Sequence, residues 1–187
     1  MTEGPEITDR PLWVFGYGSL MWNPGFPVEE RLLARLDGYH RSFCMSSIHH
    51  RGTEKDPGLV LALDPAETAA CHGVAFRVPD EAAAETVDYL RERELISSAY
   101  LERQLALTLA DGRRVTALVY VVDTEHVQYV GGMPLEEQAR IISTAIGGRG
   151  PNTEYLWNTV SHLTELGIVD DDLAWLDRRV RDLTDAP

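Results

Sequence analysis

One carboxylate in this chain falls where a helix would normally bury an apolar side chain. The segment Asp80–Glu94 is rich in alanine and other helix formers. Within it, Ala83, Val87 and Leu90 recur at the i, i+4, i+7 spacing of a buried stripe. Glu94 continues this stripe, roughly 20° from Ala83 at about 100° per residue. Burial and the negative end of the helix dipole would both raise its pKa, which suits a general base or acid.

Periodicity alone leaves a structural alternative open for Glu94. The helix could end at this residue, so that the carboxylate turns to solvent or pairs with an arginine such as Arg91. In either case the carboxylate would lie at the protein surface and would not belong to a functional site.

A second candidate is the stretch WVFGYGSLMWNP, Trp13 to Pro24, in which glycines interrupt an apolar run. Gly16 and Gly18 allow positive φ and close backbone approach, so successive N–H groups could surround an anion, and Ser19 could add a hydroxyl. The stretch has neither the G-K-[ST] of a phosphate loop nor the G-x-S-x-G of a nucleophile elbow. A simple tight turn is the alternative.

The third polar cluster is His49–Gly52. Adjacent histidines point to opposite sides of a strand and lack the i, i+4 spacing of a helical ligand pair, so no metal site is expected. Arg51 could hold a carboxylate through a bidentate guanidinium contact, although ordinary loop residues would look the same. No spacing of Ser, His and Asp supports a catalytic triad.

The composition limits the classes of function. The 187 residues favour a single domain, residues 11–187, after a polar tail, residues 1–10. A net charge of −13 argues against nucleic acid and anionic membranes as partners. We see no signal peptide and no apolar run near the roughly 20 residues of a membrane helix. The two cysteines form no C-x-x-C pair, so a reduced, cytoplasmic protein without disulfides is expected.

The elements that must position these residues are strands in the front and middle of the chain and helices toward the end. Strands are predicted at Leu12–Tyr17, Leu33–Ser46 with a bulge or turn at Gly38, Gly58–Pro65, Cys71–Pro79, and on both sides of a hairpin turn at Asp111-Gly112. Helices are predicted at Asp80–Glu94, Leu135–Ile146, Asn152–Leu166 and about Asp171–Leu183. This order favours an α+β domain with a curved or closed mixed sheet over βαβ repetition.

Seven motifs occur in one order across nearly all of the chain from Leu12 to about Leu166. They are WVFGYGSLMWNPGF, LDGYHRSF, HRGTEKDPGLVLAL, GVAFRV, YLRERELISSAY, YVGGMPLEEQARII and GRGPNTEYL. In this combination the chain resembles the ChaC family of glutathione-specific γ-glutamylcyclotransferases, whereas FGYGSL alone would indicate only the wider superfamily. The resemblance implies a barrel-like γ-glutamylcyclotransferase-like fold with flanking and C-terminal helices.

The resemblance also assigns roles to residues. Glu94, in the Arg93-Glu94 pair, matches the family's catalytic acid/base, and Tyr155 matches a tyrosine near the active site. The loop that binds the γ-glutamyl group through backbone amides corresponds to Tyr17, Gly18, Ser19 and Leu20. The implied substrate is glutathione, cleaved to 5-oxoproline and cysteinylglycine when its α-amine attacks its γ-carbonyl, with no metal or other cofactor.

Two alternatives are kept. A cyclotransferase of this fold could act on other γ-glutamyl peptides or amines, or the domain could be a non-catalytic module that binds γ-glutamyl or acidic ligands, such as a regulator of ion transport. A carboxylate on an apolar stripe is costly to bury without a task, which argues against the second. The sequence gives no signal for an oligomeric state.

Overall fold

A computed structural model describes residues 11–95 and 98–185 of the chain. The tail predicted at residues 1–10 lies outside this range. So do Ile96 and Ser97, which belong to the YLRERELISSAY motif.

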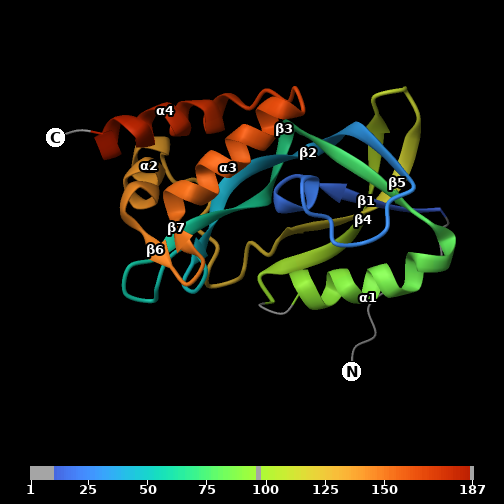
Figure 1. Cartoon of the computed structure of the whole chain (residues 1–187), viewed down its shortest axis with the longest axis horizontal. Coiled ribbons are helices and arrows are strands. Elements are labelled where there is room, and N and C mark those ends of the chain that lie inside the picture. The colour runs from blue at the N-terminus through green and yellow to red at the C-terminus, as the bar shows by residue number, and fades with distance from the viewer. Residues whose placement is uncertain (1–10, 96–97, 186–187) are drawn as a thin grey trace.

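The fold is built on a closed five-stranded barrel with the order β1-β3-β2-β4-β5 (Figure 1). The strands are β1 (Leu12–Gly16), β2 (Glu30–Ser47), β3 (Gly58–Val78), β4 (Tyr100–Leu109) and β5 (Arg114–Val122). Neighbours pair antiparallel, except that β1 and β5 lie parallel and close the barrel where Val14 pairs with Leu118. The predicted α+β class with a closed mixed sheet is therefore confirmed.

One strand assignment was wrong. The two strands predicted at Gly58–Pro65 and Cys71–Pro79 form a single strand, β3. The turn residues between them mark a large irregularity instead: Tyr39 of β2 faces Pro65, whereas Asp37 faces Ala70. Gly38 adopts a φ of 86° at this point, as a bulge in β2 requires, and Pro65 is tolerated because regular pairing is interrupted there.

Helices cover the barrel on two sides. They are η1 (Ser19–Met21), η2 (Asp80–Ala82), α1 (Ala83–Glu94), α2 (Leu135–Thr144), α3 (Asn152–Glu165) and α4 (Asp171–Asp185). Figure 1 shows α1 along the side of the molecule opposite α4. Helix α2 ends two residues before the predicted Ile146, because Ile146–Gly147 (β6) pairs with Gly150–Pro151 (β7) as a small hairpin before α3.

The apolar stripe on α1 packs as its spacing predicts. Ala83, Val87 and Leu90 are buried and share a cluster with Val14 of β1 and Leu118 of β5, where the barrel closes. This packing fixes which face of α1 meets the barrel, and therefore fixes where the last residue of the helix points.

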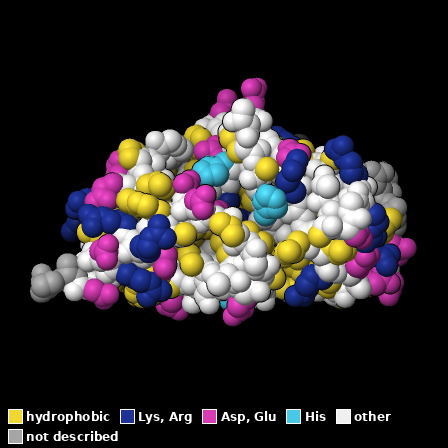
Figure 2. Space-filling model, turned by 90° about the horizontal axis from the view of Figure 1, so that it is seen from above, with side chains coloured by type: hydrophobic (Ala, Val, Ile, Leu, Met, Phe, Trp, Pro, Cys, Tyr) yellow, Lys and Arg dark blue, Asp and Glu magenta, His cyan; other side chains and the backbone are white. Residues whose placement is uncertain are grey.

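On the face seen from above, acidic and basic side chains are interspersed rather than gathered in one basic patch (Figure 2). Within residues 11–95 and 98–185, none of the helices combines the length and the apolar character that crossing a bilayer would take.

Candidate active site

A chamber of about 70 Å³ lies where the loop after β1 meets the end of α1. It is lined by residues from the front, middle and end of the chain: Phe15, Tyr17, Gly18, Ser19, Leu20, Leu61, Glu94, Tyr100, Tyr120 and Tyr155. Among the described residues that line it, Glu94 is the one with a charged side chain. A larger groove of about 820 Å³ shares Ser19, Glu94, Tyr100 and Tyr155 with the chamber, so the two spaces adjoin.

Glu94 lies at the end of the buried stripe, as the helical spacing predicts. Its side chain is 19% exposed and faces both the chamber and the groove. Burial raises the pKa of the Glu94 carboxyl above its usual value, and the nearby Arg93 guanidinium partly offsets this. The alternative partner, Arg91, is bonded instead to Glu102 at 3.0 and 2.9 Å. The result is a carboxylate that can exchange a proton closer to neutral pH.

Arg93 joins the end of α1 to the loop after β1. Its guanidinium donates to Ser19 Oγ (3.1 Å), Asn23 O (2.9 Å), Pro24 O (3.3 Å) and Tyr89 OH (3.1 Å). Its Nε lies 3.5 Å from Glu94 Oε1. These contacts hold the candidate base beside the candidate substrate loop. The sequence showed Arg93 only as the neighbour of Glu94, without any sign of what it binds.

The loop after β1 forms a short 3-10 turn. Gly18 O accepts from Met21 N (2.9 Å) and Ser19 O from Asn23 N (2.9 Å). Neither Gly16 nor Gly18 adopts the positive φ that glycine allows. Close approach is what Gly16 provides, since a Cβ there would lie 3.1 Å from the Phe76 ring. Within the described residues, the Gly18 N–H donates no hydrogen bond.

Four tyrosines line the chamber: Tyr17, Tyr100, Tyr120 and Tyr155. Burial is the main cause that raises all four pKa values, for Tyr155 to about 12, so the phenols stay protonated near neutral pH. Tyr155 OH accepts from Leu61 N (3.1 Å), and Tyr100 OH donates to Leu61 O (3.3 Å). Because a phenol both donates and accepts, Tyr155 can still donate its proton to a bound molecule.

Asn152 positions Tyr155. It is fully buried at the start of α3, where its Oδ1 accepts from Leu59 N (2.8 Å) and its Nδ2 donates to Leu59 O (2.9 Å). Tyr155, three residues later, lies on the same side of the helix and reaches Leu61. Gly58 is required beside this contact, since a Cβ there would lie 2.7 Å from Asn152 Oδ1.

Arg51 supports the same first turn of α3. Its Nη1 donates to Pro151 O (3.1 Å) and lies 3.8 Å from Glu154, and its guanidinium carbon lies 5.7 Å from the centre of the Tyr155 ring. Arg51 is not among the residues that line the chamber or the groove. The structure therefore brings Tyr17–Leu20, Glu94 and Tyr155 together and places Arg51 behind Tyr155.

The barrel, the loop after its first strand and the chamber beside it define the γ-glutamylcyclotransferase fold. A crystal structure of a yeast γ-glutamylcyclotransferase specific to glutathione superposes with a TM-score of 0.81 at 26% identity, covering 91% of this chain and 96% of that one. The family of ChaC-like proteins matches residues 12–183, and the chain belongs to this family.

Relatives with assigned activities are similar over most of their length. The glutathione-specific γ-glutamylcyclotransferase of Escherichia coli K12 is 40% identical over 165 residues, which cover 88% of this chain and 71% of that protein. The Schizosaccharomyces pombe protein of the same description is 34% identical over 179 residues, 87% of each chain.

Proposed function

We propose that this enzyme is a glutathione-specific γ-glutamylcyclotransferase that cleaves glutathione into 5-oxoproline and cysteinylglycine, with Glu94 as its general acid and base. The observation that carries the proposal is the position of Glu94: a largely buried carboxylate with a raised pKa that faces the chamber, in a chain similar to two glutathione-specific γ-glutamylcyclotransferases. The groove that adjoins the chamber gives a peptide substrate a route to this carboxylate.

The reaction needs one base and one acid in sequence. The α-amine of glutathione is largely protonated near neutral pH, since such amines have a pKa of about 8, so Glu94 first accepts its proton. The amine nitrogen then attacks the γ-carbonyl carbon and closes a five-membered ring. The attacking nitrogen now carries two protons and a positive charge, and once its first proton has passed from Glu94 to solvent, Glu94 accepts one of these two. The bond from the γ-carbon to the cysteinyl nitrogen then breaks as Glu94 gives this proton to the departing nitrogen, which leaves as a neutral amine and takes up a further proton from solvent. No covalent bond forms between enzyme and substrate.

The two adjoining spaces divide the substrate. At about 70 Å³ the chamber is far smaller than the roughly 300–1,000 Å³ of pockets that enclose drug-sized ligands, so it cannot enclose the whole tripeptide, and we place the γ-glutamyl group at it. The backbone amides of Tyr17–Leu20 bind this group and favour the folded conformer in which the amine meets the carbonyl. Tyr155, which also lines the chamber, donates a hydrogen bond to the γ-glutamyl group.

The cysteinylglycine half then occupies the groove. Arg149 lines the groove and has no ion pair with a described residue, so it is available to the glycyl carboxylate. Arg51 acts on the substrate indirectly, through Tyr155: its guanidinium lies over the Tyr155 ring and donates a hydrogen bond to Pro151 O, just before α3. The buried, free thiols of Cys44 and Cys71 are consistent with our proposal of a reducing, cytoplasmic location.

The test measures 5-oxoproline and cysteinylglycine released from reduced glutathione by the parent, by Glu94→Gln and by Glu92→Gln. Glu92 is exposed and two residues from Glu94, so its variant controls for the loss of one negative charge. Parent and Glu92→Gln should form both products, and Glu94→Gln should be slower by about 10²- to 10⁴-fold, the usual contribution of a general base.

Other outcomes point to the alternatives. Turnover of γ-glutamyl amines or dipeptides without glutathione turnover would indicate a cyclotransferase of different specificity. Binding of γ-glutamyl compounds without any turnover would indicate a regulatory module. Equal activity of Glu94→Gln and the parent would mean that Glu94 is not the base.

A further inference from the structure

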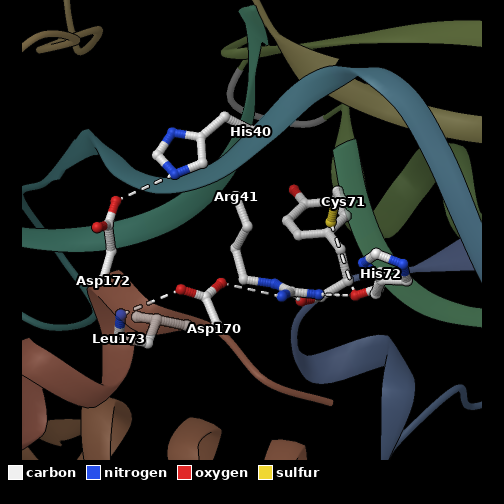
Figure 3. A network of polar contacts seen from close by, with 8 residues as sticks. His40, Arg41, Cys71, His72, Asp170, Asp172 and Leu173 are labelled. Carbon is white, nitrogen blue, oxygen red and sulfur yellow. Dashed lines mark hydrogen bonds and ion pairs between the residues drawn. The ribbon is translucent and has the colours of Figure 1, made fainter. Parts of the chain in front are cut away.

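A buried arginine contacts the backbone of the candidate substrate loop without lining the chamber. Arg41 of β2 is 3% exposed. Its Nε donates to Tyr17 O at 2.7 Å, its Nη2 donates to His72 O of β3, and its Nη1 lies 3.1 Å from the carboxylate of Asp170 (Figure 3). It lines a separate cavity of about 220 Å³ and not the chamber.

Asp170 connects this arginine to the last helix. Its Oδ2 accepts from Arg41, and its Oδ1 accepts from Leu173 N (3.1 Å) in the first turn of α4 (Figure 3). The Asp170 side chain is only 13% exposed, so the ion pair is shielded from solvent. Arg41 therefore ties together four parts of the fold: β2, β3, the start of α4 and the loop after β1.

The contact with Tyr17 O controls the direction of an amide. In a trans peptide the C=O and the following N–H point in opposite directions. The peptide group that joins Tyr17 to Gly18 has its carbonyl fixed toward Arg41 by a short, charge-assisted hydrogen bond. Its N–H, that of Gly18, is consequently directed away from Arg41, and Gly18 is one of the residues that line the chamber.

We propose that Arg41 is a positioning residue for the proposed cyclotransferase reaction: by holding the Tyr17 carbonyl, it directs the Gly18 N–H toward the γ-glutamyl group of glutathione. This inference rests on the proposed function. It assigns a role in substrate binding to Arg41 and Asp170, although neither residue contacts the substrate. The glutamyl α-carboxylate, which keeps its charge throughout the reaction, is the group that the Gly18 N–H binds.

This role has a kinetic signature. An interaction made equally in the ground state and in the transition state changes KM and leaves kcat unchanged. A loss of stability alone would instead reduce the folded fraction, which lowers the apparent kcat and leaves KM as it was. Measuring KM and kcat together therefore distinguishes a positioning role of Arg41 from a loss of stability.

The first variant is Arg41→Lys, which keeps the charge but cannot donate to three acceptors in the directions of a guanidinium. KM for glutathione should rise at least tenfold with kcat within threefold of the parent. The matched control is Arg179→Lys. Arg179 also anchors α4, through two hydrogen bonds to Glu136 of 2.9 and 2.8 Å, but does not contact the loop, so its variant should keep the parent's KM. An unchanged KM in folded Arg41→Lys would overturn the proposal.

Asp170→Asn provides a second variant if Arg41→Lys does not fold. It keeps an oxygen for Leu173 N and leaves the guanidinium in place, but removes the charge that holds Nη1. We expect KM to rise about threefold, and a KM equal to that of the parent would count against the role of the pair.

A binding measurement separates this inference from the proposed function. Calorimetry gives the dissociation constant of glutathione for Glu94→Gln and for Glu94→Gln with Arg41→Lys, neither of which depends on turnover. The double variant should bind at least tenfold more weakly. Equal affinities would overturn the role of Arg41 even if the parent cleaves glutathione, and a parent without turnover but with this difference in affinity would overturn only the reaction. A parent that does not cleave glutathione, together with a Glu94→Gln variant that does not bind it, would overturn both.

Discussion

Replacing Asn152 by alanine should have two effects: it should destabilise the protein and disturb the chamber. The amide of Asn152 is the partner of both backbone groups of Leu59. Ser46, opposite Leu59 on β2, uses its own backbone groups with Gln128 instead. Without Asn152, a buried N–H and a buried C=O lose their partners, at about 1–3 kcal/mol each, so the free energy of unfolding should fall by roughly 2–6 kcal/mol.

The assay is thermal denaturation followed by circular dichroism. For a domain of this size each kcal/mol shifts Tm by roughly 2–4 °C, so a loss of about 3 kcal/mol corresponds to about 6–12 °C. Activity should also fall at temperatures where the variant is fully folded, because Tyr155 is no longer held against Leu61.

The control for this prediction is Thr159→Val. Thr159 is fully buried in the same helix, and its hydroxyl donates to Tyr155 O at 2.8 Å. Because this hydrogen bond lies within α3, its loss does not weaken the attachment of α3 to the barrel. It should cost less than about 1.5 kcal/mol, the usual net value of one such bond. A Tm for Asn152→Ala within about 3 °C of the parent would refute the reasoning that this amide holds α3 on β3.

Three further predictions concern charge. First, kcat/KM for glutathione should rise with pH through an acidic limb whose apparent pKa exceeds 4.5, since burial raises the pKa of Glu94; a pH–rate profile with its limb at or below 4.5 would contradict this. Second, a carboxyl whose pKa is raised by folding stabilises the folded state at low pH, and this stabilisation is lost as the pH rises through the raised pKa. Glu94→Gln should therefore have a higher Tm than the parent at neutral pH. The Tm values of the two proteins should become equal below about pH 4.5. Third, Arg149→Gln should raise KM for glutathione more than KM for its glycyl ethyl ester, which has no carboxylate to pair; an equal change for both substrates would assign Arg149 no part in binding.

The sequence predicted best what depends on local periodicity. The spacing of Ala83, Val87 and Leu90 placed Glu94 on the barrel side of α1, because a helix turns by a nearly constant angle per residue and its apolar face must meet the core. The hairpin around Asp111-Gly112 followed from turn chemistry in the same way: β4 and β5 pair from Tyr100 with Val122 to Thr108 with Arg114.

What could not be predicted depends on contacts between distant parts of the chain. Asn152 meets Leu59 across 93 positions and Arg41 meets Asp170 across 129, and in the sequence each is an ordinary polar residue. The contacts of Arg51 also could not be predicted from its type. Its guanidinium suggested a carboxylate ligand, but its placement depends on the fold of α3, which brings the ring of Tyr155 beneath it. The turn residues around Pro65 were misread because a bulge and a turn use the same amino acids.

The residues that line the chamber come from widely separated parts of the chain, and this matters while the protein is being synthesised. Residues from Phe15 to Tyr155 line it, and the barrel cannot close until Leu118 can pair with Val14. A nascent chain still attached to the ribosome carries Glu94 long before Tyr155 has emerged, and chains fold only as their partners become available. A partly made chain therefore presents Glu94 before the chamber around it is complete, so the candidate site forms only late in synthesis.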